Sequence, residues 1–139
     1  MKEIKFRVWN TEANKMIIKV KEMGVFALKS IYSIDEFLVV PTDEKYPLMQ
    51  YTGLKDKNDV EIYEGDIVRV IDDIGYYGMG IAIFCLGSFC FEWIDDSEAN
   101  IEPIVTTKKI NNNQKLEVIG NIYENPELLK DKKWLVKNY

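Results

Sequence analysis

The chain has 139 residues, of which 47% are hydrophobic and 12% aromatic, and its net charge at neutral pH is −5. This size and apolar content suit one folded domain and argue against long disordered segments. Nonspecific binding to duplex DNA depends on Lys and Arg side chains that neutralise phosphates, so the acidic balance argues against that function. The sequence has no histidine, which removes the commonest general base and every Ser-His or Cys-His nucleophile pair.

Membrane insertion, disulfides and bound metal are also disfavoured. No apolar run approaches the roughly 20 residues that cross a bilayer, and residues 1–10 lack the apolar run of a signal peptide. Two cysteines, Cys85 and Cys90, cannot form a disulfide framework and are too few for a structural zinc site without histidine. We therefore expect a cytoplasmic protein with no membrane association, no metal and no cofactor.

The first third of the chain predicts short strands. Ile4, Phe6 and Val8 alternate with other residues, and this period of two predicts a half-buried strand. Residues 10–15 form a polar loop, after which residues 16–20 return as the second strand of a hairpin. Residues 24–47 predict further short elements, which are strands near residues 25–29 and 36–40 and one helical turn over Ser33–Phe37.

The most distinctive stretch is LMQYTGLKDKNDVEIYEGDIVRV, residues 48–70, which is rich in turn formers. Residues 48–52 predict a short strand that Gly53 ends. The polar run KDKND then predicts a turn, in which Asn58 tolerates the left-handed backbone conformation better than most residues do.

Apolar character returns at Ile62, and Glu64-Gly65-Asp66 predicts a second tight turn before a strand over residues 66–71. Short strands joined by tight turns are typical of small barrels. We interpret Glu64 and Asp66 as solvated turn residues rather than catalytic groups, because catalysis would need a second acidic group that converges with them in a cleft.

Residues 72–80, DDIGYYGMG, contain three glycines. Their spacing matches neither a phosphate-binding P-loop nor a dinucleotide-binding fingerprint. We therefore expect a flexible hairpin connection that exposes Tyr76 and Tyr77 at its tip, where they would be available to a partner.

The segment IAIFCLGSFCFEWI, residues 81–94, predicts a β-hairpin with Gly87-Ser88 as a two-residue type II′ turn. This register places Cys85 opposite Cys90, and we interpret both as buried thiols rather than as a redox pair. The face assigned to the core consists of Ala82, Phe84, Leu86, Phe89, Phe91 and Trp93.

The opposite face of this hairpin is also mostly apolar, since it carries Ile81, Ile83 and Ile94 beside Glu92 and the cysteines. Such a face must be covered, either by more of this chain or by another subunit. The predicted interaction surface therefore consists of Tyr76, Tyr77, Ile81, Ile83 and Ile94.

The end of the chain predicts a loop, a strand and a helix. Residues 95–100, DDSEAN, offer oxygen ligands for weak binding of a divalent cation, but they lack the spacing of an EF-hand, and we favour a solvated loop. Residues 116–123 predict the last strand, in which Gly120 indicates a bulge or close packing. Asn125 as N-cap and Pro126 at the first helical position predict a short C-terminal helix. Its basic face consists of Lys130, Lys132, Lys133 and Lys137.

Three stretches resemble the YopX family of bacteriophage and prophage proteins, and they occur in the expected order. They are KFRVWNTEANKMI (residues 5–17), LMQYTGLKDKNDVEIYEGDIV (residues 48–68) and EVIGNIYENPELL (residues 117–129). Two positions depart from the family pattern, which usually has Asn-Gly at Asn58-Asp59 and Trp-Asp at Trp9-Asn10. Aspartate at a position that favours positive φ costs on the order of 1 kcal/mol.

The resemblance implies a mainly β fold, all-β with short helices, and homo-oligomers. It predicts one domain over residues 1–139, with a β-hairpin region over 1–50, a small SH3-like barrel over 51–124 and a helix or tail over 125–139. The resemblance implies no catalytic, cofactor-binding or metal-binding residues. The matching positions of the middle stretch are Tyr51, Gly53, Asp56, Asn58, Tyr63, Glu64, Gly65 and Asp66, which turn geometry explains in part.

Four functions are considered. We favour a non-enzymatic interaction module, encoded by a phage or prophage, that self-associates and binds a host or phage protein. The main alternative is a small barrel that binds single-stranded nucleic acid through Tyr76, Tyr77, Trp134 and the tail lysines, although the acidic charge makes this partner disfavoured. A DNA mimic is a third hypothesis. The fourth is an enzyme whose carboxylates are Glu64, Asp66, Asp72, Asp73, Asp95 and Asp96.

Overall fold

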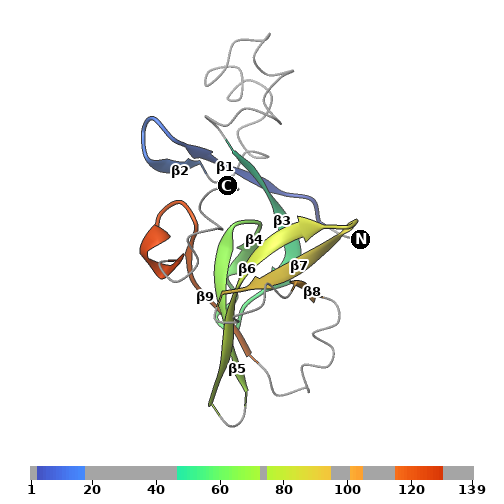
Figure 1. Ribbon diagram of the computed structural model, residues 1–139. Helices are drawn as coiled ribbons and strands as arrows, with labels where there is room; N and C mark the ends of the chain where they lie inside the picture. The colour runs from blue at the N-terminus through green and yellow to red at the C-terminus, as the bar shows by residue number, and fades with distance from the viewer. Residues whose placement is uncertain (1–2, 18–46, 73–74, 95–100, 105–114, 130–139) are drawn as a thin grey trace. The chain divides into compact units, whose positions relative to one another are not determined.

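The computed structural model describes residues 3–17, 47–72, 75–94, 101–104 and 115–129 (Figure 1). The chain divides into two compact units, Met1–Gly53 and Leu54–Tyr139. Several predicted elements lie outside the described residues. They are the strands expected near residues 25–29 and 36–40, the turn over Ser33–Phe37, the loop over 95–100 and the basic tail.

The first unit contains the predicted N-terminal hairpin. Strand β1 (Phe6–Asn10) pairs antiparallel with β2 (Lys15–Ile17) on one side and with β3 (Leu48–Lys55) on the other. Asn10 Oδ1 accepts hydrogen bonds from Glu12 N and Ala13 N, both at 3.0 Å, so the side chain at the family's Trp-Asp position stabilises the turn. The hairpin prediction is confirmed.

Two local predictions for this region are wrong. Arg7, Val8 and Trp9 are buried one after another, whereas Ile4 is exposed. Because consecutive strand residues point to opposite faces, both faces of β1 are covered and no period of two results. Gly53 does not end its strand either: β3 continues through Gly53, which has a φ of 87°, to Lys55, and it has β4 (Glu61–Tyr63) as its neighbour in the sheet.

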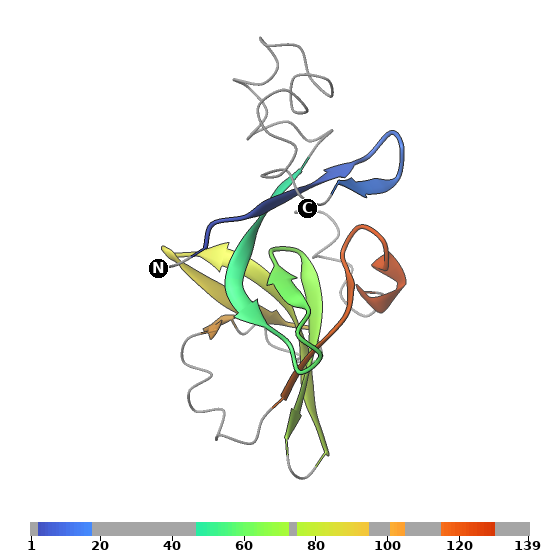
Figure 2. The same ribbon diagram turned by 180° about the vertical axis from the view of Figure 1, so that it is seen from behind.

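The second unit contains a five-stranded antiparallel sheet with the order β8-β7-β6-β5-β9 (Figures 1 and 2). Its strands are β5 (Asp66–Asp72), β6 (Gly75–Cys85), β7 (Ser88–Trp93), β8 (Ile101–Pro103) and β9 (Lys115–Asn121). Helical structure in this unit, within the residues described, includes the 3₁₀ turn η3 (Pro126–Leu129). The fold is therefore mainly β, with this sheet forming a half-barrel.

Apolar side chains cover both faces of the five-stranded sheet. Ile67 and Val68 are adjacent in β5, and both are fully buried, on opposite faces. The first cluster consists of Ile62, Val68, Val70, Ala82, Phe89, Phe91, Trp93 and Ile104. The second cluster consists of Ile67, Ile81, Ile94, Ile122 and Leu129. Leu129 comes from η3, so residues of this chain cover the second face.

The β6–β7 hairpin has a different turn from the one predicted. Its loop residues are Leu86 and Gly87, with φ values of 51° and 81°, and Cys85 pairs with Ser88. Positive φ at both loop positions is the requirement of a type I′ turn. The shift keeps each residue on its predicted face, so the core positions of Ala82, Phe89, Phe91 and Trp93 are confirmed.

Packing explains the shifted register. Trp93 lies opposite Gly80, where a Cβ atom would come within 3.2 Å of Phe91 Cβ and 3.5 Å of Trp93 Cε3, so the base of Phe91 and the ring of Trp93 occupy the space that the glycine leaves. Phe84 pairs with Phe89, and their rings meet edge to face with centroids 5.1 Å apart. Phe84 is nevertheless 53% exposed. The prediction that Phe84 and Leu86 belong to the core is wrong.

The same shift separates the two cysteines in the register. Cys90 pairs with Ile83, and its Sγ donates a weak hydrogen bond to Cys85 O at 3.7 Å. Neither cysteine forms a disulfide, and Cys90 is buried while Cys85 is half-buried. The interpretation as a buried thiol therefore holds for Cys90, and the expected Cys85–Cys90 cross-strand pair is wrong.

The C-terminal part of the described chain confirms the roles of two residues. The register between β5 and β9 shifts at Ile67/Val68, opposite Gly120, which is the predicted bulge. Gly120 is also closely packed, since a Cβ there would lie 2.6 Å from Asn125 Cγ. The helical turn begins at Pro126 as predicted. However, Asn125 Oδ1 accepts a hydrogen bond from Asn121 N at 3.2 Å and so binds back to β9.

Candidate functional site

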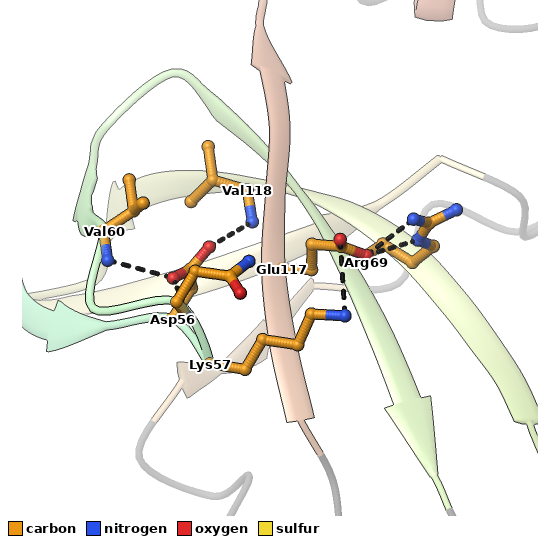
Figure 3. Close-up of polar contacts among 7 residues, drawn as sticks. Asp56, Lys57, Val60, Arg69, Glu117 and Val118 are labelled. Carbon is orange, nitrogen blue, oxygen red and sulfur yellow. Dashed lines mark hydrogen bonds and ion pairs between the residues drawn. The ribbon is translucent and has the colours of Figure 1, made fainter.

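The turn between β3 and β4 is organised around the carboxylate of Asp56 (Figure 3). Its Oδ1 accepts hydrogen bonds from Asn58 N at 2.7 Å and Val60 N at 3.0 Å. Its Oδ2 accepts one from Val118 N at 3.0 Å, and Val118 lies 62 residues further along the chain. The Asp56 residue is buried, and both of its oxygens therefore have backbone donors.

The left-handed backbone conformation expected at Asn58 occurs instead at its neighbour, Asp59. Asp56 N donates to Val60 O at 2.8 Å and Asp59 N donates to Asp56 O at 3.1 Å, which closes the turn. Asp59, with a φ of 66°, occupies the left-handed region, and Asn58 does not. The expectation that aspartate would occupy the family's glycine position at positive φ is confirmed, whereas the left-handed assignment of Asn58 is wrong.

This turn also covers the outer edge of β9. One edge of β9 pairs with β5. On the other edge, Leu116 O accepts a hydrogen bond from Lys57 N at 2.9 Å, and Val118 N donates to Asp56. Asn125 N donates to Asn121 O at 2.9 Å further along the same strand. Because an uncovered strand edge is a template for unwanted pairing, Asp56 and Asn125 give this edge side-chain protection.

Glu117 connects the same turn to the sheet. Its Oε2 accepts hydrogen bonds from Arg69 Nε at 3.0 Å and from Arg69 Nη2 at 2.6 Å. Lys57 Nζ lies 3.3 Å from the other oxygen, Oε1 (Figure 3). The hydrogen bonds that Arg69 donates are the largest cause that lowers the pKa of Glu117. The contact with Lys57 and the positive charges of Arg69 and Lys57 lower the pKa further, and together these effects outweigh partial desolvation, which raises it. Glu117 is thus held as a carboxylate between two cations.

Asp56 is also held as a carboxylate, but different interactions lower its pKa. Burial raises the pKa of its carboxyl group, but the backbone donors of Val118, Val60 and Asn58, with the charge of Lys57, outweigh burial. The pKa of Asp56 is therefore lower than its ordinary value. A carboxylate with this many fixed donors is suited to holding a turn, since proton transfer would disrupt those bonds.

The second signature turn, Glu64-Gly65-Asp66, also has a structural role. Gly65 has a φ of 81°, its N donates to Ala82 O at 2.8 Å, and its O accepts from Ile122 N at 2.9 Å. Asp66 Oδ2 accepts a hydrogen bond from Tyr63 N at 2.8 Å. The turn interpretation is supported, but Asp66 is fully buried and not solvated as predicted.

The three isoleucines of the predicted interaction surface do not form an exposed patch. Ile81 is 0% exposed and Ile94 is 4% exposed, because both belong to the second apolar cluster, and Ile83 packs at its margin. Tyr76 and Tyr77 lie within β6, where Tyr76 pairs with Ile71, and not at the tip of a connection. The alternation of apolar residues identified this face correctly but could not show that Ile122 and Leu129 cover it.

Sequence reasoning missed the exposed end of the β6–β7 hairpin. Phe84 is 53% exposed, and Leu86 has a relative exposure of 101%. We call these two side chains the β6–β7 tip. An exposed leucine at positive φ would have been found if Leu86-Gly87 had been considered as a type I′ turn.

The remaining candidate groups of the sequence were acidic. Within the ranges that the structure describes, no group of three or more His, Cys, Asp or Glu side chains could hold a metal ion. Glu64 and Asp66 belong to one turn, while Asp73, Asp95 and Asp96 lie outside the described residues. In the same described ranges, no helix is long and apolar enough to cross a membrane.

The fold is mainly β, and motif carboxylates of this chain hold two turns and cover a strand edge. The chain belongs to the YopX protein family, whose model matches residues 5–130. It is similar to protein EF1440 from Enterococcus faecalis, known from a crystal structure, with a TM-score of 0.60 and 27% identity; the match covers 93% of this chain and 99% of that chain. No curated protein gives a significant match.

Proposed function

We propose that this YopX-family protein is a non-enzymatic protein-interaction module, which self-associates and acts in the cytoplasm of a bacterial host. A phage or prophage origin agrees with the family resemblance of its three motifs. The observation that carries the proposal is the β6–β7 tip, where Phe84 and the fully exposed Leu86 present apolar surface to solvent. Apolar side chains gathered at one exposed place are a feature of protein-binding sites.

The roles of the motif carboxylates support this proposal. Asp56 binds three backbone amides, Asp66 binds the amide of Tyr63, and Glu117 binds Arg69 and Lys57. A general acid or base must be able to exchange a proton with a substrate. These three carboxylates are instead engaged in bonds that maintain turns and strand edges, which favours a binding function.

The proposal is tested by capturing a tagged copy from its bacterial host, with and without nuclease, and by measuring the mass of the purified protein in solution. A protein partner that is retained after nuclease treatment, or a mass above that of one chain, supports it. Partners that disappear with nuclease would instead favour the alternative, binding to nucleic acid. A monomer with no partner would contradict the proposal.

A further inference from the structure

We draw no further inference here: the strongest candidate, the exposed apolar tip of the β6–β7 hairpin formed by Phe84 and Leu86, is a small surface patch, and nothing in the part of the chain that the structure describes shows what covers it.

Discussion

Replacement of Asp56 by Asn gives the most direct test of the edge-covering turn. In the wild type, the carboxylate accepts hydrogen bonds from Asn58 N, Val60 N and Val118 N. An asparagine can keep its oxygen on the first two donors. Its side-chain NH₂ group would then face the Val118 N–H group, so two hydrogen-bond donors would meet. In the wild type, Val118 N and Asp56 Oδ2 are 3.0 Å apart at this position.

The expected cost follows from this geometry. A hydrogen bond to a charged group contributes about 1.5–3 kcal/mol, and an unsatisfied buried donor costs about 1–3 kcal/mol. Because Asp56 is buried, but water can partly replace the bond at a strand edge, we expect Asp56→Asn to lower the free energy of unfolding by about 2–4 kcal/mol. That is a large part of the 5–15 kcal/mol typical of a small domain.

Urea denaturation followed by tryptophan fluorescence measures this change, with Asp59→Asn as the matched control. Both variants remove one negative charge from the same turn. The Asp59 side chain is 83% exposed and pairs with Lys55 at 3.3 Å, and asparagine suits its positive φ, so the control should change stability by less than about 0.5 kcal/mol. Equal stabilities of the two variants would refute the assigned role of Asp56.

The pH dependence of the same variant provides an independent check. The folded-state pKa of Asp56 is below its ordinary value of 3.8. The contribution of the carboxylate is therefore fully present above about pH 3.8 and is lost as the pH falls through the lowered folded-state value. The stability difference between wild type and Asp56→Asn should be constant between pH 5 and pH 7, roughly, and should shrink in more acidic solution. A difference that grows on acidification would contradict this account.

Three further variants test neighbouring features. Gly120→Ala places a Cβ 2.6 Å from Asn125 Cγ, and calorimetry should show a loss of about 1–3 kcal/mol from overpacking; an unchanged melting temperature would argue against the close contact. Asp59→Gly relieves the residue with a φ of 66° and should raise stability in urea by up to about 1 kcal/mol, and a decrease would mean that its ion pair dominates. Glu117→Gln should lower the melting temperature at pH 7, because Arg69 loses its carboxylate partner. Since the pKa of Glu117 is lowered, this difference from the wild type should be full above its ordinary value of 4.5 and should shrink as the pH falls through the lowered folded-state value; a difference that grows on acidification would contradict the assignment.

Features set by local chemistry could be predicted from the sequence. The turn at Gly65, the bulge at Gly120 and the start of a helical turn at Pro126 all depend on the backbone preferences of single residues. The face pattern of the β6–β7 hairpin was also predictable, because alternation survives a register shift of two residues.

Features set by distant contacts could not be predicted. The register of the β6–β7 hairpin depends on the space above Gly80 that Phe91 and Trp93 occupy, and turn preference alone favoured a different pairing. The burial of Ile81 depends on Leu129, which is distant in sequence. In the same way, KDKND indicates a turn, but nothing local indicates that Asp56 binds Val118.

Two of the three motifs that carry the family resemblance are bonded to each other. The middle motif contributes Asp56 and Lys57, the last motif contributes Glu117 and Val118, and these residues meet along the edge of β9. These two motifs therefore stabilise the half-barrel of this chain, which is a structural role.

The β6–β7 tip lies outside all three motifs, which span residues 5–17, 48–68 and 117–129. The Phe84 and Leu86 side chains are exposed, so exchanging them costs little of the packing that stabilises the sheet. The two tip side chains can therefore be exchanged to test for binding with little loss of stability.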